Sequence, residues 1–593
     1  MYEQIFDPVG NSLGLSSIFA ALPLLTIFIL LGALKMKAQW AGLISLAVAL
    51  AVAILVYDMP TGQALSTAAE GASFGIFPIM WIVINAIWIY NMTVVTGHFD
   101  VLRRSFGTIS DDQRIQAIII AFCFGGLLEA LAGFGTPVAI SSVMLIALGF
   151  KPLKAATVAL VANTAPVAFG AIAVPITTLA TVTGLPVDDL GGTVGRQTPI
   201  LALLVPLALV FMVDGMRGVR QTWPAAIAGG VAFAIGQFVC SNYLSVELTD
   251  IVASLVGAAA IVALLRVWKP TEELTADRMS DEEVSSRITG ATATAHAVET
   301  GGSRRQSGTG SSEPTGHSDH SSQPGADVPT GGTGAAATGA GRGAAHHDSG
   351  SDIFKAYSPY LIIIAVFSIA QIGVIKDLLA KGVVKFAWPG LNVVTPSGSA
   401  PSAATFNFNW LPSGGTLLLI CGFITMAVLG VGPGRALKSY LHTLDQLKWA
   451  ILTVAAVLAL AYVMNFSGQT ITIGQWMAGT GGFFAFLSPV LGWLGVAVTG
   501  SDTSSNSLFG TLQVAAASKA GLDPVLLASA NTSGGVMGKM ISPQNLAIAA
   551  AATGMAGQEG ELFRKVIWWS LGFLLFMCVL VYLQSTSVLG WMI

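Results

Sequence analysis

Two apolar stretches, one in each half of the chain, are interrupted at matching places by residues that break helices. Residues 127–184 contain LLEALAGFGTPVAI and VANTAPVAFGAIAVPITT, and residues 498–554 contain VTGSDTSSNSLFG and SANTSGGVMGKMISPQN. Three positions recur 368 residues later: Asn163, Gly170 and Pro175 as Asn531, Gly538 and Pro543. Lipid cannot satisfy the backbone groups that such residues leave unpaired, so both stretches must be buried in protein or line a cavity. Paired interruptions of this kind indicate the binding site of a secondary transporter.

Charged residues make up only 10% of the 593 residues, whereas 53% are hydrophobic. A soluble domain has about a quarter charged residues. Apolar runs of nearly twenty residues, long enough to cross a bilayer, recur along almost the whole chain. The sequence therefore predicts an all-α polytopic membrane protein, and the formal net charge of −3 gives no indication of a nucleic-acid partner.

The apolar runs predict about twelve transmembrane helices and two re-entrant hairpins. The hairpins are expected at 117–149, broken at Gly133–Pro137, and at 476–520, broken at Gly500–Asn506. Two further helices are expected to be broken, 155–183 near Asn163–Pro166 and 525–553 near Asn531–Gly535. Separate helices are expected at 197–213 and 222–242, with a loop between them.

The segments divide the chain into four parts. They are a first transmembrane repeat (1–213), a connecting helix pair (214–269), a polar linker (270–352) and a second, inverted repeat (353–593). The linker is rich in Gly, Ser, Thr and Ala, so it is predicted to be disordered and cytoplasmic. With both termini outside, sixteen Lys and Arg residues fall in short cytoplasmic connections and five outside, which favours this orientation.

Three ionisable residues fall inside broken apolar segments: Glu129, Asp502 and Lys539. A charge at mid-membrane costs about 2.5–3.5 kcal/mol on insertion scales, so it normally faces a cavity and a partner. The repeat counterpart of Lys539 is Ala171, so the cation occurs in one half only, and it is predicted to bind the carboxylate of an anionic substrate. The alternative is a structural ion pair with Glu129 or Asp502. Glu129, in apolar surroundings, is the first candidate to carry a coupled proton. Asp502 is the second, with helix capping as its alternative role.

Short polar residues and exposed backbone amides surround these breaks. Half-helix N-termini favour carboxylates through their dipoles, and hydroxyl and amide groups suit a small hydroxy acid. Taken singly, each Ser or Thr is more often a helix-packing residue. The predicted substrate-binding residues are Lys539, Gly135, Thr136, Asn163, Thr164, Ser501, Thr503, Ser504, Asn531, Thr532 and Ser533.

Other classes of function find little support. The chain has no phosphate-binding loop, which disfavours an ATP-driven pump. The four cysteines stand alone in apolar runs, and the histidines lack the spacing of metal ligands. We therefore expect a protein that is not an enzyme and that has no cofactor and no metal site.

The motifs resemble those of the bacterial L-lactate permease family of proton-linked hydroxy-acid transporters. The matching strings are FPIMWIVINAIWIYN, FGGLLEALAGFGTPVAI, NTAPVAFGA, GSDTSSNSLFGTLQ and GGVMGKMISPQNLAIA, which lie in both halves. The resemblance covers nearly the whole chain apart from the linker. It implies import of L-lactate, and of glycolate or D-lactate, by proton symport across the cytoplasmic membrane.

Two alternatives stay open at this point. Carbonyl groups exposed beside Asn163 and Asn531 would suit a coupling Na⁺ instead of a proton. A passive organic-anion channel, or a membrane sensor acting through the polar tract, is the alternative from another class. The oligomeric state, a homo-oligomer included, is left open, and the predicted partners are a small monocarboxylate, a proton and the lipid bilayer.

Overall fold

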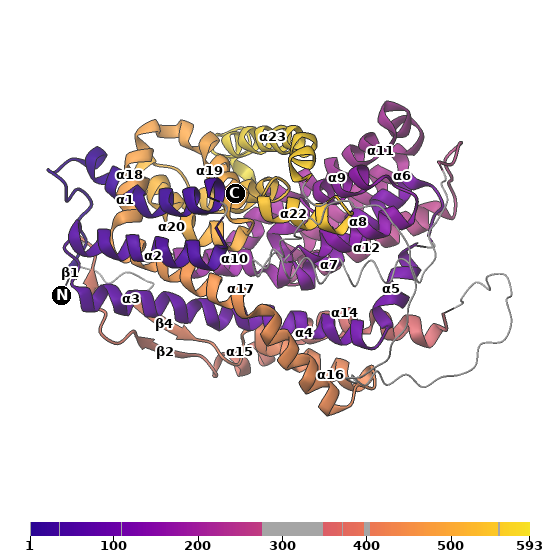
Figure 1. The fold of residues 1–593 in the computed structure, drawn as a ribbon, viewed down its shortest axis with the longest axis horizontal. Helices are drawn as coiled ribbons and strands as arrows, with labels where there is room; N and C mark the ends of the chain where they lie inside the picture. Colours follow the sequence, from indigo (N-terminus) through magenta and orange to yellow (C-terminus); the bar gives the residue numbers. More distant parts are fainter. Residues whose placement is uncertain are drawn as a thin grey trace, which may run out of the picture.

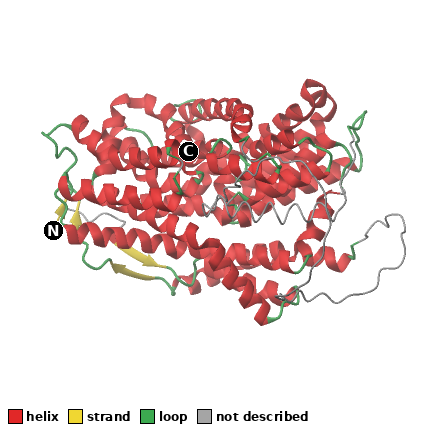
Figure 2. Ribbon diagram, in the orientation of Figure 1, coloured by secondary structure: helices red, strands yellow, loops and turns green. Residues whose placement is uncertain are grey.

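The computed structural model describes residues 2–34, 36–107, 109–133, 135–274, 348–370, 372–396, 404–555 and 558–593. The described chain is almost entirely helical, and most of the long helices run along the longest axis of the molecule (Figures 1 and 2). Within the described ranges, four short strands form two small two-stranded sheets. The predicted linker falls largely outside the described residues. The prediction of an all-α polytopic membrane protein is confirmed.

The first half of the chain supplies twelve numbered α-helices. They are α1 (Leu13–Phe28), α2 (Ala38–Leu55), α3 (Thr61–Phe74), α4 (Trp81–Val95), α5 (His98–Gly107), α6 (Gln113–Gln116), α7 (Gly125–Ala132), α8 (Thr136–Ala147), α9 (Pro152–Ala162), α10 (Gly170–Thr183), α11 (Val187–Val239) and α12 (Thr249–Leu265). Residues 117–124 continue the helix from α6 into α7 as a π-helical segment.

The second half has the same helical character. Its helices are α14 (Gly350–Ala370), α15 (Gly373–Ala380), α16 (Gly414–Val428), α17 (Pro433–Ser467), α18 (Gln469–Met477), α19 (Phe484–Thr499), α20 (Asp502–Ala520), α21 (Pro524–Lys539), α22 (Pro543–Ala552) and α23 (Glu559–Gln584). The strands pair β1 (Tyr2–Glu3) with β3 (Val393–Val394) in parallel and β2 (Val384–Ala387) with β4 (Thr405–Phe408) antiparallel.

Within the described ranges, nine helices are long and apolar enough to cross a membrane. A tenth candidate is the pair Pro152–Ala162 and Val167–Thr183, which bends by 63° at its break. This bend confirms the predicted broken helix at 155–183. The predicted total of twelve spans with two re-entrant hairpins, and the division into inverted repeats, stay predictions.

The predicted helices at 197–213 and 222–242 are both present. They lie within α11 (Val187–Val239), whose two helical parts are separated where Asp214 and Gly215 leave helical geometry. The two parts pack against each other, because Thr198 Oγ1 donates to Gln237 Oε1 at 3.3 Å and Arg196 Nε donates to Asn242 Oδ1 at 3.0 Å. Gly215 has a φ of 62°, a conformation that glycine adopts without steric cost. The chain therefore reverses direction at these two residues, between the two predicted helices.

One correction concerns the break in the segment 525–553. It was expected near Asn531–Gly535, but α21 is helical through Lys539 and the break lies at residues 540–542. The glycines instead allow close helix packing: a Cβ added at Gly534 would lie 2.1 Å from the backbone oxygen of Pro489 in α19. Small residues in membrane helices often serve such contacts, so a glycine-rich run alone does not locate a break.

Buried ion pairs join the loops around the described ends of the linker. Arg114, which is 1% exposed, pairs with Asp112 at 2.6 Å and with Asp214 at 3.1 Å. The backbone N–H of Leu274 donates to Asp112, and Arg114 donates to the carbonyl oxygen of residue 272. At the other end, Asp348 accepts two hydrogen bonds from Arg104 of α5. Both described ends are thus fixed to helices of the first half.

Candidate functional site

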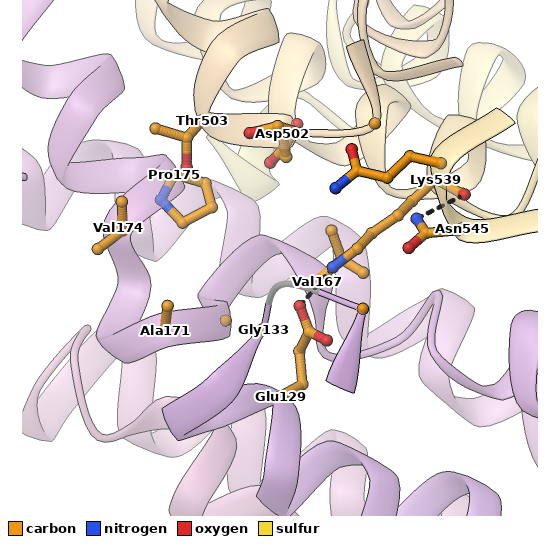
Figure 3. Close-up of a pocket in the computed structure, with 15 residues that line it drawn as sticks. Glu129, Gly133, Val167, Ala171, Val174, Pro175, Asp502, Thr503, Lys539 and Asn545 are labelled. Atoms are coloured by element: carbon orange, nitrogen blue, oxygen red, sulfur yellow. Dashed lines mark hydrogen bonds and ion pairs between the residues drawn. The ribbon is translucent and has the colours of Figure 1, made fainter. Parts of the chain in front are cut away.

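A cavity of about 60 Å³ lies where the four broken segments meet. Its lining comes from both halves of the chain, and several of its side chains point toward one another across it (Figure 3). The lining residues are Glu129, Gly133, Gly135, Val167, Gly170, Ala171, Val174, Pro175, Gly500, Ser501, Asp502, Thr503, Lys539, Gln544 and Asn545. Its volume is several times what one water needs, which suits a small ligand.

The side chain of Lys539 spans the two halves and pairs with Glu129. Its Nζ lies 2.5 Å from Glu129 Oε1, and the two side chains are 10% and 2% exposed (Figure 3). The other carboxylate oxygen, Oε2, accepts a hydrogen bond of 2.9 Å from Nδ2 of Asn163. The ion pair with Glu129, which was one of the predicted alternatives to substrate binding by Lys539, is therefore present. It lies on the cavity wall, where a bound anion can compete for the lysine.

Two glycines let the backbone approach the Glu129 carboxylate. A Cβ added at Gly133 would lie 2.9 Å from Glu129 Oε1, and one added at Gly170 would lie 2.8 Å from it. Gly133 is the C-cap residue of α7 and Gly170 begins α10. A side chain at either position would displace the carboxylate from Lys539, so the pairing depends on both glycines.

Four helices begin at this cavity. The N-termini of α8 and α20 follow Gly135 and Gly500, whose φ values of 76° and 74° lie in the left-handed region that favours glycine. The N-termini of α10 and α22 follow the other two breaks. Helix N-termini carry partial positive charge and unpaired amides. Together with Lys539 they make a positive environment for an anion.

The start of α10 departs from ordinary helix geometry. Ala171, Ile172 and Ala173 have φ values of 46°, 58° and 55°, in the left-handed region. For residues with a Cβ this costs roughly 1–2 kcal/mol each. Strain of this kind clusters at functional sites, where the surrounding structure holds it in place. Right-handed helix begins after it, so Pro175 lies in the first turn and matches Pro543 at the start of α22.

Asp502 lines the cavity together with Val174 and Pro175 (Figure 3). The residue is 3% exposed, and neither of its carboxyl oxygens has a hydrogen-bond partner among the described residues. The predicted capping role falls to Ser501 instead, whose side chain accepts from the N–H of Ser504. A buried carboxyl group without a partner is free to interact with a ligand or a proton.

The predicted site residues divide into three groups. Glu129, Gly135, Ser501, Asp502, Thr503 and Lys539 line the cavity, and Asn163 contacts it through Glu129. Thr136, Thr164 and Ser504 are buried near the breaks without lining it. The remaining three, on α21, form hydrogen bonds between helices: Asn531 with Gln513 and Asn506, Thr532 with Asn506, and Ser533 with Gln197.

Sequence reasoning missed several polar residues of this region. Gln544 and Asn545 line the cavity from the first turn of α22, and Asn545 Nδ2 donates to the carbonyl oxygen of Lys539 at 2.9 Å. They lie in the SPQN string, where a helix start after Ser-Pro was the available signal. Asp250 on α12 is fully buried and was also missed.

Comparison with known proteins fits this architecture. The L-lactate permease family model matches residues 16–300 and 333–588. The chain belongs to the L-lactate permease family. The L-lactate permease of Bacillus subtilis (strain 168) is 40% identical over 100% of both chains. The glycolate permease GlcA of Escherichia coli (strain K12) is 40% identical over 100% of this chain and 99% of its own. This member of the L-lactate permease family is accordingly a multi-pass membrane transporter.

Among solved structures, that of MtrF from Neisseria gonorrhoeae, reported with a class of antimetabolite efflux pumps, is similar at a TM-score of 0.45. The similarity covers 95% of this L-lactate permease family member and 97% of MtrF, with 13% sequence identity.

Proposed function

We propose that this protein imports L-lactate, and also glycolate or D-lactate, by proton symport across the bacterial cytoplasmic membrane. The observation that carries the proposal is the Lys539–Glu129 ion pair on the wall of a small cavity at which four helix N-termini meet. Lys539 and the helix ends bind the substrate carboxylate. Ser501, Thr503 and Asn545 lie in position to bind its hydroxyl group.

Coupling follows from charge balance at this pair. In the empty site one cation faces one carboxylate, Lys539 and Glu129. A substrate anion that replaces Glu129 on the lysine would leave two carboxylates beside one cation. Two like charges 4 Å apart repel by about 4 kcal/mol at an effective dielectric constant of 20. Protonation of Glu129 removes this repulsion, so one proton enters with each substrate anion. Asp502 is the second candidate for the proton, because its carboxyl oxygens are unpartnered among the described residues.

The proposed orientation places both termini outside and residues 270–352 in the cytoplasm. It rests on the excess of Lys and Arg in the short connections assigned to the cytoplasm. The ion pairs of Arg104 and Arg114 gather several of these connections at the described ends of the linker. Labelling of single cysteines placed near each terminus tests this orientation in whole cells.

Transport of radiolabelled L-lactate into proteoliposomes tests the proposal. With one proton per lactate, an inward pH gradient of one unit drives about tenfold accumulation, since one unit is worth about 1.36 kcal/mol. Glycolate is expected to compete for uptake. Uptake that only equilibrates the two compartments would contradict symport and indicate a passive channel.

A sodium-coupled carrier is the second candidate. Asn163 Oδ1 and Thr164 Oγ1, at the break after α9, have no hydrogen-bond partner among the described residues. Oxygen atoms of this kind at a helix break are suitable Na⁺ ligands. The same vesicles decide the question: a Na⁺ gradient imposed at equal pH should give no accumulation if the proton is the coupling ion.

A further inference from the structure

A second buried carboxyl group lies behind Glu129. Asp250, in the first turn of α12, is fully buried. Its Oδ1 accepts a hydrogen bond of 3.4 Å from Nε2 of Gln237, and its Oδ2 has no partner among the described residues. Among the described residues, no Lys or Arg forms an ion pair with Asp250. Burying a carboxylate without a cation is costly, so a group of this kind is held where it serves a function.

The packing of α12 against α7 directs Asp250 toward Glu129. A Cβ added at Gly126 of α7 would lie 2.6 Å from Oγ of Ser254, so these helices are in close contact. Asp250 is one turn from Ser254 on α12, and Glu129 is one turn from Gly126 on α7, so each pair shares a helix face. Asp250 and Glu129 therefore lie on the faces along which α12 and α7 pack together.

Asp250 comes three residues after a turn that lines a second, much larger cavity. This cavity has a volume of about 510 Å³, and its lining includes the turn from Ser241 to Glu247. Glu247 accepts from Oγ of Ser245 at 2.6 Å, and Oγ1 of Thr249 donates to the carbonyl oxygen of Ser245 at 3.1 Å. Polar groups thus continue from the cavity to the residue next to Asp250.

Gln237 connects Asp250 to the broken helix beside the substrate cavity. Its Nε2 also lies 3.3 Å from the carbonyl oxygen of Ala165, in the break between α9 and α10. Asn163, two residues earlier, donates to Glu129. Glu129 is therefore bonded directly to this break, through Asn163, and Asp250 is linked to it through Gln237.

We propose that Asp250 carries the coupled proton between the large polar cavity and Glu129. The Asp250 carboxylate takes up a proton delivered from the cavity and forms an O–H bond. This bond then breaks as an O–H bond forms on Glu129, and Asp250 returns to its carboxylate. While Lys539 is paired with Glu129, it favours proton transfer away from Glu129. When a substrate anion is bound to Lys539, proton transfer toward Glu129 is favoured. The proposal rests on the proposed proton symport.

The test compares Asp250→Asn with the wild-type protein in proteoliposomes, using radiolabelled L-lactate in two assays. Counterflow, the exchange of internal for external lactate without a gradient, reports binding and translocation. Accumulation under a pH gradient of one unit reports coupling. The D250N protein is expected to exchange lactate within about twofold of wild type but to lose accumulation from about tenfold to none. Ser254→Ala, on the same helix face, is the matched control and should accumulate lactate as wild type does.

The outcomes separate this proposal from the proposed function. If the wild-type protein itself does not accumulate lactate under the pH gradient, proton symport is wrong. If wild type accumulates and D250N accumulates equally, only the role of Asp250 is wrong. If a folded D250N protein loses both counterflow and accumulation, the proposed role of Asp250 is also wrong, because the residue would then serve binding or structure. Should D250N not fold, Asp250→Glu decides: it keeps a titratable carboxyl, so exchange without accumulation would contradict the relay.

Discussion

Replacing Lys539 by methionine removes the cation from the site while keeping an unbranched side chain of similar length. The ammonium group is 2.5 Å from the Glu129 carboxylate, and both side chains are almost fully buried. Removing one partner of such a pair costs about 3–5 kcal/mol. A substrate carboxylate that takes the place of Glu129 would lose a contact of the same kind. At 1.4 kcal/mol for each factor of ten, this loss is at least about a hundredfold in substrate affinity.

The remaining attraction comes from the helix N-termini, each worth about 0.3–1 kcal/mol when exposed, which does not replace the lysine. Counterflow of radiolabelled L-lactate in proteoliposomes is the suitable assay, because it needs no proton gradient. At substrate concentrations below saturation, K539M is expected to exchange at about 1% of the wild-type rate or less. Lys519, exposed in the last turn of α20, provides the control K519M, which should exchange normally. A K539M protein that exchanges at more than half the wild-type rate would refute the assignment of Lys539 to the substrate.

Three further predictions concern coupling and packing. Glu129→Gln should keep lactate counterflow but abolish accumulation under a pH gradient, because the amide cannot take up the proton; persistent accumulation would exclude Glu129 as the carrier. Asp502→Asn, measured in the same way, should still accumulate lactate, and its failure to do so would move the proton role to Asp502. Gly534→Ala places a Cβ 2.1 Å from a backbone oxygen of α19, so overpacking should cost about 1–3 kcal/mol and lower the Tm. Gly572→Ala, which meets nothing within 4 Å, is its control and should leave the Tm unchanged or higher.

Sequence alone located three of the four breaks because their residues have a local effect on the backbone. Helices are interrupted within the predicted ranges Gly133–Pro137, Asn163–Pro166 and Gly500–Asn506, although α8 already begins at Thr136 and α20 at Asp502. The glycines of α21 were misread, because glycine serves two purposes in a membrane helix. It either releases the backbone or admits a neighbouring helix, and only the position of α19 determines which of these applies.

For the site residues, too, some could be predicted from the sequence and others could not. Lys539, Glu129 and Asp502 stood out because a charge in an apolar run demands a partner. Asn531, Thr532 and Ser533 looked equally suited to a substrate, but their side chains point to neighbouring helices. Which face of α21 meets the cavity depends on its rotation in the bundle. Asp250 escaped notice because an acid at the start of an apolar helix is ordinary, and its burial results from packing against α7.

The anchoring of residues 272–274 and of Asp348 has a practical consequence. Arg114 and Asp112 bind residues 272–274, and Arg104 binds Asp348, so the chain is held on both sides of residues 275–347. The positions of the helices are therefore set by contacts outside that stretch. A fluorescent protein or an affinity tag inserted between residues 275 and 347 should leave transport intact. The same insertion placed between Asp112 and Arg114 would separate the arginine from the carboxylate that pairs with it and would disrupt the start of α6.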